Sequence, residues 1–236
     1  MKKYYKTTLS TSVEELLSLF PYEEFKSPFR STVALINYVE HGSFLKVINA
    51  DYDDTKIVYE YEVQVLEGFG RPSCSDLLVQ TQNTSYIIEA KRTETKYDTV
   101  SEWRSGSENK ELVLSGWLQL ISNYTNEEID LKEILNVPYQ MIHRIASACS
   151  LKTKINKVIY LCFDLNSEMR KYYKDNINKM CVLTNNKIDI ILDEISIKKK
   201  SMQINLEELW NNGFRDLSMK VIKGTKLNLL MDFEQI

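Results

Sequence analysis

Two acidic residues and one lysine stand at positions of this 236-residue chain where their side chains can act together. Asp76 opens an apolar run, and Glu89 and Lys91, two residues apart, close the next one. Side chains alternate along a β-strand, so Glu89 and Lys91 share a face while Ala90 points away. If the two runs pair as a hairpin, two carboxylates and an ammonium group meet at one end of it. Such a set can bind a cation and stabilise negative charge that develops during a reaction.

The length of the connection decides whether Asp76 reaches that face. If residues 81–84 form a four-residue loop, Gln80 pairs with Ser85, and Asp76 falls opposite Glu89 with the two Cβ atoms about 5 Å apart. A loop of odd length would turn Asp76 to the other side of the sheet. Two carboxylates at that distance repel each other unless a cation lies between them, and oxygen ligands without nearby His or Cys favour Mg²⁺ or Mn²⁺. We expect the metal ligands to be Asp76, Glu89 and Ala90.

Caps and hydrophobic periodicity predict the elements that position these groups. Helices are predicted over residues 13–20, 32–40, 111–124, 139–149 and 167–179. Strands are predicted over residues 57–65, 76–80, 86–91, 157–163 and 188–197, with 157–163 buried on both faces and a loop over 67–75. This order is typical of an α/β fold with a central mixed sheet flanked by helices. We expect one domain over residues 1–197, and an appendage or a continuation of that domain over 198–236.

Composition narrows the range of functions. The net charge of −3 counts against a module that binds nucleic acid by blanket phosphate neutralisation. The four cysteines show no Cys-x-x-Cys spacing, and two histidines are too few for a His-rich metal site. No apolar run approaches the roughly 18 residues of a membrane span, and no signal-peptide core follows the basic start. We therefore expect a cytoplasmic protein with no membrane partner.

Any surface that faces nucleic acid must come from local basic clusters. The chain offers three of them: Lys91-Arg92, Lys152-Thr153-Lys154 and Lys198-Lys199-Lys200.

The stretch from Asp76 to Lys91 resembles the active-site signature of the PD-(D/E)XK nuclease superfamily. Glu-x-Lys occurs four times in the chain, but only Glu89-Ala90-Lys91 ends an apolar strand that follows another strand opened by Asp. The resemblance spans residues 32–164, with Ser75-Asp76 in place of the family's Pro-Asp, and segments 89–103 and 138–144 are similar to an uncharacterised bacterial branch. It implies a restriction-endonuclease-like core. It also implies a Mg²⁺- or Mn²⁺-dependent endonuclease that hydrolyses DNA phosphodiester bonds in defence, restriction or repair.

In the expected mechanism, Asp76 and Glu89 hold a metal ion that lowers the pKa of bound water and polarises the phosphorus. Lys91 orients the attacking water or offsets the charge that develops on the phosphate oxygens. Glu62 on the preceding strand is a candidate for a further carboxylate, with Glu60 on the same face one pleat away.

The superfamily often adds a Gln or Tyr from a helix that follows the signature. Gln140 is the favoured candidate for that place, and Gln119, Tyr124 and Arg144 are the alternatives. Gln140, His143 and Arg144 lie one turn apart on a polar stripe of their predicted helix.

Two other interpretations remain open. In the first, the chain is a non-catalytic interaction module that kept the nuclease scaffold. In the second, it is a nuclease that cleaves RNA. Among nucleic acids, DNA is the favoured partner. Trp103 and His143 are interpreted as structural residues. Target specificity is expected in residues 94–110 or in the last third of the chain, and cleavage of both DNA strands would call for a homodimer.

Overall fold

The structure, a computed structural model, describes residues 1–42, 44–45, 48, 54–216 and 230–236. Its centre is a mixed sheet with the strand order β2-β1-β3-β4-β5-β6-β7-β8. The strands are β1 (Lys2–Tyr5), β2 (Thr8–Ser10), β3 (Lys56–Val63), β4 (Ser73–Gln80), β5 (Thr84–Lys91), β6 (Ile155–Phe163), β7 (Asp189–Lys199) and β8 (Met231–Gln235). β3, β4 and β5 form an antiparallel meander, and β6 and β7 continue parallel to β5.

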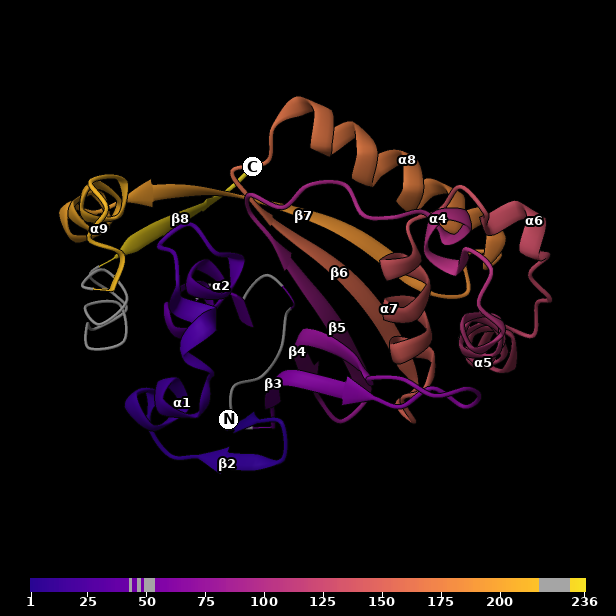
Figure 1. Ribbon diagram of the computed structural model, residues 1–236. Helices are drawn as coiled ribbons and strands as arrows, with labels where there is room; N and C mark the ends of the chain where they lie inside the picture. Colours follow the sequence, from indigo (N-terminus) through magenta and orange to yellow (C-terminus); the bar gives the residue numbers. More distant parts are fainter. Residues whose placement is uncertain (43, 46–47, 49–53, 217–229) are drawn as a thin grey trace.

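Helices cover both faces of this sheet (Figure 1). They are α1 (Val13–Leu19), the 3₁₀ helix η1 (Tyr22–Phe25), α2 (Ser31–Glu40), α4 (Val100–Arg104), α5 (Glu108–Thr125), α6 (Leu131–Ile134), α7 (Tyr139–Cys149), α8 (Ser167–Leu183) and α9 (Ser201–Asn211). α1 and α2 lie on one face, and α5 and α7 lie on the other. Each face therefore has its own hydrophobic core.

β6 separates the two cores, which explains its nearly continuous apolar sequence. Ile159 and Leu161 belong to the core under α2, whereas Val158 and Tyr160 belong to the core under α7. The expectation that this strand is buried on both faces is confirmed. Such a strand anchors the neighbouring β5 and the site residues on it.

The predicted α/β architecture, a mixed sheet flanked by helices, is what the structure has. The predicted helix over 139–149 matches α7, and the other predicted helices and strands are present with ends that differ by a few residues. The loop predicted over 67–75 is shorter, because β4 already begins at Ser73. β1, β2 and β8 were not predicted from the sequence; they are short strands near the two edges of the sheet.

The C-terminal segment contributes to this same sheet. β8 pairs antiparallel with β7, and Leu230 and Met231 are buried in the core under α2. Leu206 of α9 joins that core as well. The described part of residues 198–236 thus adds one strand to the central sheet and apolar side chains to the core under α2.

No helix among the described residues is long and apolar enough to cross a membrane.

Candidate active site

The β4–β5 hairpin has the register that the sequence predicts. Gln80 pairs with Ser85, and extending the ladder along the hairpin brings Asp76 opposite Glu89. Asp76 Oδ2 accepts a hydrogen bond from the Ala90 amide at 2.7 Å. This register places the first carboxylate beside the Glu-x-Lys segment, although β5 already begins at Thr84, inside the predicted loop.

Glu89 is the centre of a buried polar network, with 2% of its surface exposed. Its Oε1 accepts hydrogen bonds from Lys91 Nζ at 2.7 Å and from Gln140 Nε2 at 2.9 Å. Its Oε2 accepts a hydrogen bond from Arg144 Nε in a second ion pair. A buried carboxylate is tolerable only when it is paired in this way.

α7 supplies two of the partners of Glu89. Gln140 and Arg144 are four residues apart, so they project from the same face of the helix toward β5. The predicted candidate Gln140 therefore lies at the site, together with Arg144. Gln119 lines a different hollow on α5, and Tyr124 packs in the core under α7.

The charges of the cluster set its protonation states. Burial and the negative charge of Glu89 raise the pKa of Asp76 well above its ordinary value. Burial alone would raise the pKa of Glu89 too, but Arg144 and Lys91 outweigh it and hold that pKa at about 2. Burial opposes the charged form of Lys91, yet Glu89 and Asp76 raise its pKa well above the ordinary value. Lys91 is therefore a permanent cation, and Asp76 is the carboxylate that takes up a proton most readily.

Tyr97 is a member of the site that sequence reasoning missed. Lys91 Nζ donates a hydrogen bond to its phenol oxygen and lies 4.6 Å from its ring centroid. Tyr97 lies six residues beyond Lys91 in a polar segment outside regular structure, where no sequence pattern marks it. Its contact fixes the direction of the Lys91 ammonium group.

Glu62 is not brought to the site. It is exposed on β3, and its Oε1 pairs with Lys6 Nζ at 2.5 Å. The reason is Glu60, whose backbone has a left-handed φ of 52° that interrupts the alternation of side chains along β3. Glu60 Oε2 accepts a hydrogen bond from Cys74 Sγ at 3.1 Å, and burial raises the pKa of Glu60. The change of face is visible in the neighbours of Glu60, because Tyr59 belongs to the core under α2 and Val63 to the core under α7.

His143 and Trp103 lie next to the network. His143 Nδ1 is 2.8 Å from Ser73 Oγ and 3.1 Å from Arg144 Nη1. Burial and the positive charge of Arg144 lower the pKa of His143 well below its ordinary value, so the ring is neutral. The Trp103 ring stacks on Tyr139 with a centroid distance of 3.5 Å. Both residues have the packing contacts that a structural role requires.

Two of the three basic clusters do not form free positive surfaces. The Arg92 side chain is only 3% exposed, donates to the Pro28 carbonyl at 2.7 Å and pairs with Glu207. The lysines of the C-terminal cluster are all neutralised, in the pairs Lys198–Glu234, Lys199–Glu207 and Lys200–Asp232. Lys152 and Lys154 are exposed, and neither has an acidic partner in the described part of the chain.

The oxygen donors of the site fit Mg²⁺. The second oxygen of Asp76 has no hydrogen-bond partner among the described residues, and Gln140 Oε1 is buried without one. Mg²⁺ commonly binds through one or two carboxylates and completes its shell with water and phosphate oxygens. To bind the metal as well, Glu89 would have to use an oxygen that already accepts a hydrogen bond from Lys91 or Arg144. Ala90 could ligate only through its carbonyl, whereas its N–H donates a hydrogen bond to Asp76.

No group of three or more His, Cys, Asp and Glu residues able to hold a metal ion occurs in the described ranges. A metal here would therefore rest on two carboxylates.

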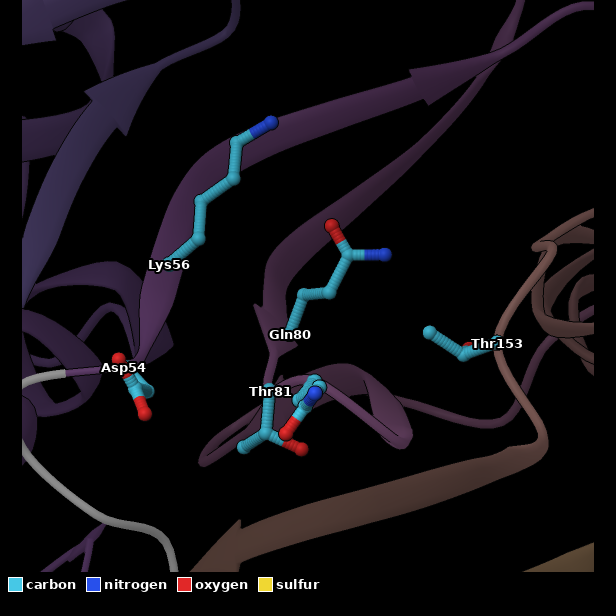
Figure 2. Close-up of a pocket in the computed structure, with 6 residues that line it drawn as sticks. Asp54, Lys56, Gln80, Thr81 and Thr153 are labelled. Carbon is cyan, nitrogen blue, oxygen red and sulfur yellow. The ribbon is translucent and has the colours of Figure 1, made fainter.

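A separate hollow of about 510 Å³ lies at the other end of the hairpin, around Lys56, Gln80 and Thr153 (Figure 2). Gln80 is four residues along β4 from Asp76, which corresponds to about 13 Å at the rise of a strand. The side chains around it are mostly neutral hydroxyls and amides, and it takes no part in the charged network.

The fold and site define an α/β protein with a buried acid–base cluster between its central strands and one covering helix. Residues 8–213 match the model of a domain of unknown function, DUF6946, and the chain belongs to that family. Comparison with curated proteins gave no match, and comparison with solved structures gave none either.

Proposed function

We propose that the protein is a Mg²⁺- or Mn²⁺-dependent nuclease that hydrolyses phosphodiester bonds in DNA. The observation that carries this proposal is the convergence of Asp76, Glu89 and Lys91 on neighbouring strands, with Gln140 reaching Glu89 from the covering helix. Two carboxylates and a fixed ammonium group are the minimal set for holding a metal and a phosphate side by side.

The order of elements supports a restriction-endonuclease-like core within the α/β fold. In chain order, helix α2 precedes the antiparallel meander of β3, β4 and β5, and helix α7 precedes β6, which is parallel to β5. Helices α4, α5 and α6 lie between β5 and α7. The sequence resemblance implies a helix, a strand pair that carries Asp and then Glu-x-Lys, a helix and a buried strand, and this order agrees with that of α2, β4, β5, α7 and β6. Asp76 lies on the second strand of the meander and the Glu-x-Lys segment on the third.

Each side chain has a role that follows from its contacts. Asp76, Glu89 and the Ala90 carbonyl would hold the metal, which supplies an activated water and polarises the phosphate when bound. Lys91 stays protonated, so it acts as a hydrogen-bond donor and a positive charge rather than as a general base. Arg144 and Gln140 keep the Glu89 carboxylate ionised and oriented.

One observation favours the rival interpretation of a non-catalytic scaffold. Both oxygens of Glu89 are already paired with cations, so the network is complete without a metal. A scaffold that binds a partner would need no more than this.

The decisive experiment incubates the protein with plasmid, single-stranded DNA and RNA, each with Mg²⁺, Mn²⁺ or EDTA. The Asp76→Asn variant removes one carboxylate. The control is Asp193→Asn, because Asp193 is also a buried aspartate whose pKa burial raises, and it lies at a different place, beside Gln235. We expect metal-dependent cleavage of DNA by the wild type and the control, and none by Asp76→Asn.

If the protein cleaves RNA and not DNA, the substrate in this proposal changes from DNA to RNA. Absence of cleavage from every substrate and metal, or equal cleavage by Asp76→Asn, would overturn it in favour of the scaffold.

A further inference from the structure

An aromatic cleft of about 350 Å³ lies beside the charged network, where the β3–β4 connection meets α4, α5 and α7. None of the roles assigned above uses it. The side chains that characterise it are Phe69, Arg71, Trp103, Trp117, Tyr139 and His143.

The inner wall of the cleft is a fixed stack of rings. Trp103 and Tyr139 are parallel within 6°, with 3.5 Å between their centroids. Trp117 Nε1 donates a hydrogen bond to the Tyr139 hydroxyl at 3.0 Å, and Lys110 Nζ donates to the Trp103 carbonyl at 2.5 Å. These contacts hold the aromatic surface in place before any ligand arrives.

The outer rim is held just as firmly. The Asn109 side chain accepts from the Phe69 amide and donates to the Phe69 carbonyl, both at 2.7 Å. Gly68 has a φ of +79°, and a Cβ on it would lie 2.7 Å from Val113 Cγ2, so only glycine permits this close approach to α5. The Phe69 side chain is nevertheless 88% exposed. A large ring is thus presented to solvent by a rigid backbone.

Two polar groups of the cleft have unused hydrogen-bonding capacity. Arg71 is exposed and has no acidic partner in the part of the chain that the structure describes. The neutral His143 uses Nδ1 as the acceptor toward Ser73 and Arg144, so Nε2 carries the proton. Among the described residues, that Nε2–H donor has no partner.

Ser73 joins the cleft to the network. It lines the cleft, accepts from Arg144 Nη1 at 2.8 Å and is within hydrogen-bond distance of His143. Arg144 in turn pairs with Glu89. A group bound in the cleft therefore lies next to the acidic centre.

We propose that this cleft binds one unstacked base of a nucleic-acid strand, with Phe69 stacking on the base and Arg71 pairing with an adjacent phosphate. The inference rests on the proposed function, because it places the base next to the bond to be cleaved. A flat π-face, a hydrogen-bond acceptor for His143 and a neighbouring anion are together the features of a nucleotide. Aromatic stacking of this kind accepts any base.

The test measures binding by fluorescence anisotropy in EDTA, so that no cleavage is needed. The probes are a labelled single-stranded DNA oligonucleotide, an RNA of the same sequence, the corresponding duplex, and an oligonucleotide of the same length with abasic sites in place of its central bases. The variants are Phe69→Ala and Arg71→Ala. The controls are Phe214→Ala, an exposed phenylalanine outside the cleft, and Arg215→Ala, an arginine also outside it.

We expect the wild type to prefer single strands to the duplex, and base-containing strands to abasic ones. Phe69→Ala should lose about 10-fold or more in affinity for the base-containing strand and lose the preference over the abasic strand. Arg71→Ala should lower the affinity for both the base-containing and the abasic strand, and the two control variants should bind as the wild type does.

Equal affinity of the wild type for base-containing and abasic strands, or an unchanged preference in Phe69→Ala, would overturn the inference. That outcome is distinguishable from failure of the proposed function. If the Phe69→Ala variant cleaves normally and the wild type shows no preference for base-containing strands, only the proposal of a base-binding cleft is refuted. If binding depends on the bases but no substrate is cleaved, the nuclease proposal is refuted and the base-binding cleft is retained.

Discussion

Replacement of Glu89 by glutamine tests the charged network most directly. The amide has nearly the shape of the carboxylate and keeps one oxygen that can accept a hydrogen bond. It removes the negative charge that Lys91 and Arg144 share, so both buried cations lose the carboxylate with which they form ion pairs. We therefore expect Glu89→Gln to lower the free energy of unfolding, in addition to abolishing cleavage.

The magnitude follows from the pKa of Glu89. Its ordinary value is 4.5, and the two cations hold the pKa of Glu89 at about 2 in the folded protein. The difference is roughly 2.5 units, and at about 1.4 kcal/mol per unit it corresponds to about 3 kcal/mol. Removal of one partner from a buried ion pair costs a similar amount, about 3–5 kcal/mol. For a chain of this length, the loss would lower the melting temperature by about 6–12 °C.

The contribution of ionised Glu89 to the free energy of unfolding depends on pH. The pKa of Glu89 is depressed in the folded state, so its contribution to stability is complete above pH 4.5. It is lost progressively as the pH falls from 4.5 toward the folded value of about 2. The stability difference between wild type and Glu89→Gln should therefore be full at pH 7 and should shrink below pH 4.5.

The assay is urea denaturation of both proteins at pH 7, 5 and 3.5. Glu168→Gln is the control, because Glu168 is 74% exposed and its ion pair with Lys96 lies at the surface; such pairs contribute about 0–1 kcal/mol. Equal stability of wild type and Glu89→Gln at pH 7 would refute the buried network. So would a loss that stays constant down to pH 3.5.

Three further predictions concern the same cluster. Asp76→Asn should raise the free energy of unfolding at neutral pH by about 0.5–2 kcal/mol, because it removes a buried negative charge beside Glu89. Since the pKa of Asp76 is raised in the folded state, this gain should vanish as the pH falls below 3.8. A lower melting temperature of Asp76→Asn at pH 7 would contradict the prediction. Lys91→Met should reduce cleavage of a labelled oligonucleotide at least about 100-fold, whereas Lys96→Met at the surface should not; equal rates would contradict the role of Lys91. Mg²⁺ alone should raise the melting temperature little, and Ca²⁺ together with single-stranded DNA should raise it by more than the sum of their separate shifts; additive shifts would contradict coupling between the two.

The register of the site was predictable because it depends on local chain geometry. Asp76 could be placed opposite Glu89 from two facts alone: four residues separate the paired Gln80 and Ser85, and side chains alternate with a period of two along a strand. The same reasoning failed for Glu62, because it assumed an extended backbone at Glu60. A left-handed residue inside a strand leaves no signal in the types of its neighbours.

Contacts between parts of the chain that are distant in sequence were harder to predict from the sequence. The polar stripe on α7 was visible in the sequence, but its ion pair with Glu89 depends on how the helix lies across the sheet. The basic clusters were visible too, and their neutralisation by Glu207, Asp232 and Glu234 was not. The short strand β1 carries little pattern of its own, because its pairing with β3 bridges more than 50 residues of sequence.

The balance of charge in the site bears on how ligands can enter it. Asp76 and Glu89 are opposed by Lys91 and Arg144, so the four groups cancel when both carboxylates are ionised, and Glu60 adds a weaker negative charge from further away. A divalent cation that enters alone brings a net positive charge next to two buried cations. A phosphodiester that enters with it offsets part of that charge, and each ligand then raises the affinity of the other by the same factor. In the proposed nuclease, the ion pair between Arg144 and Glu89 would hold the site together before ligands bind and would make metal binding depend on the substrate.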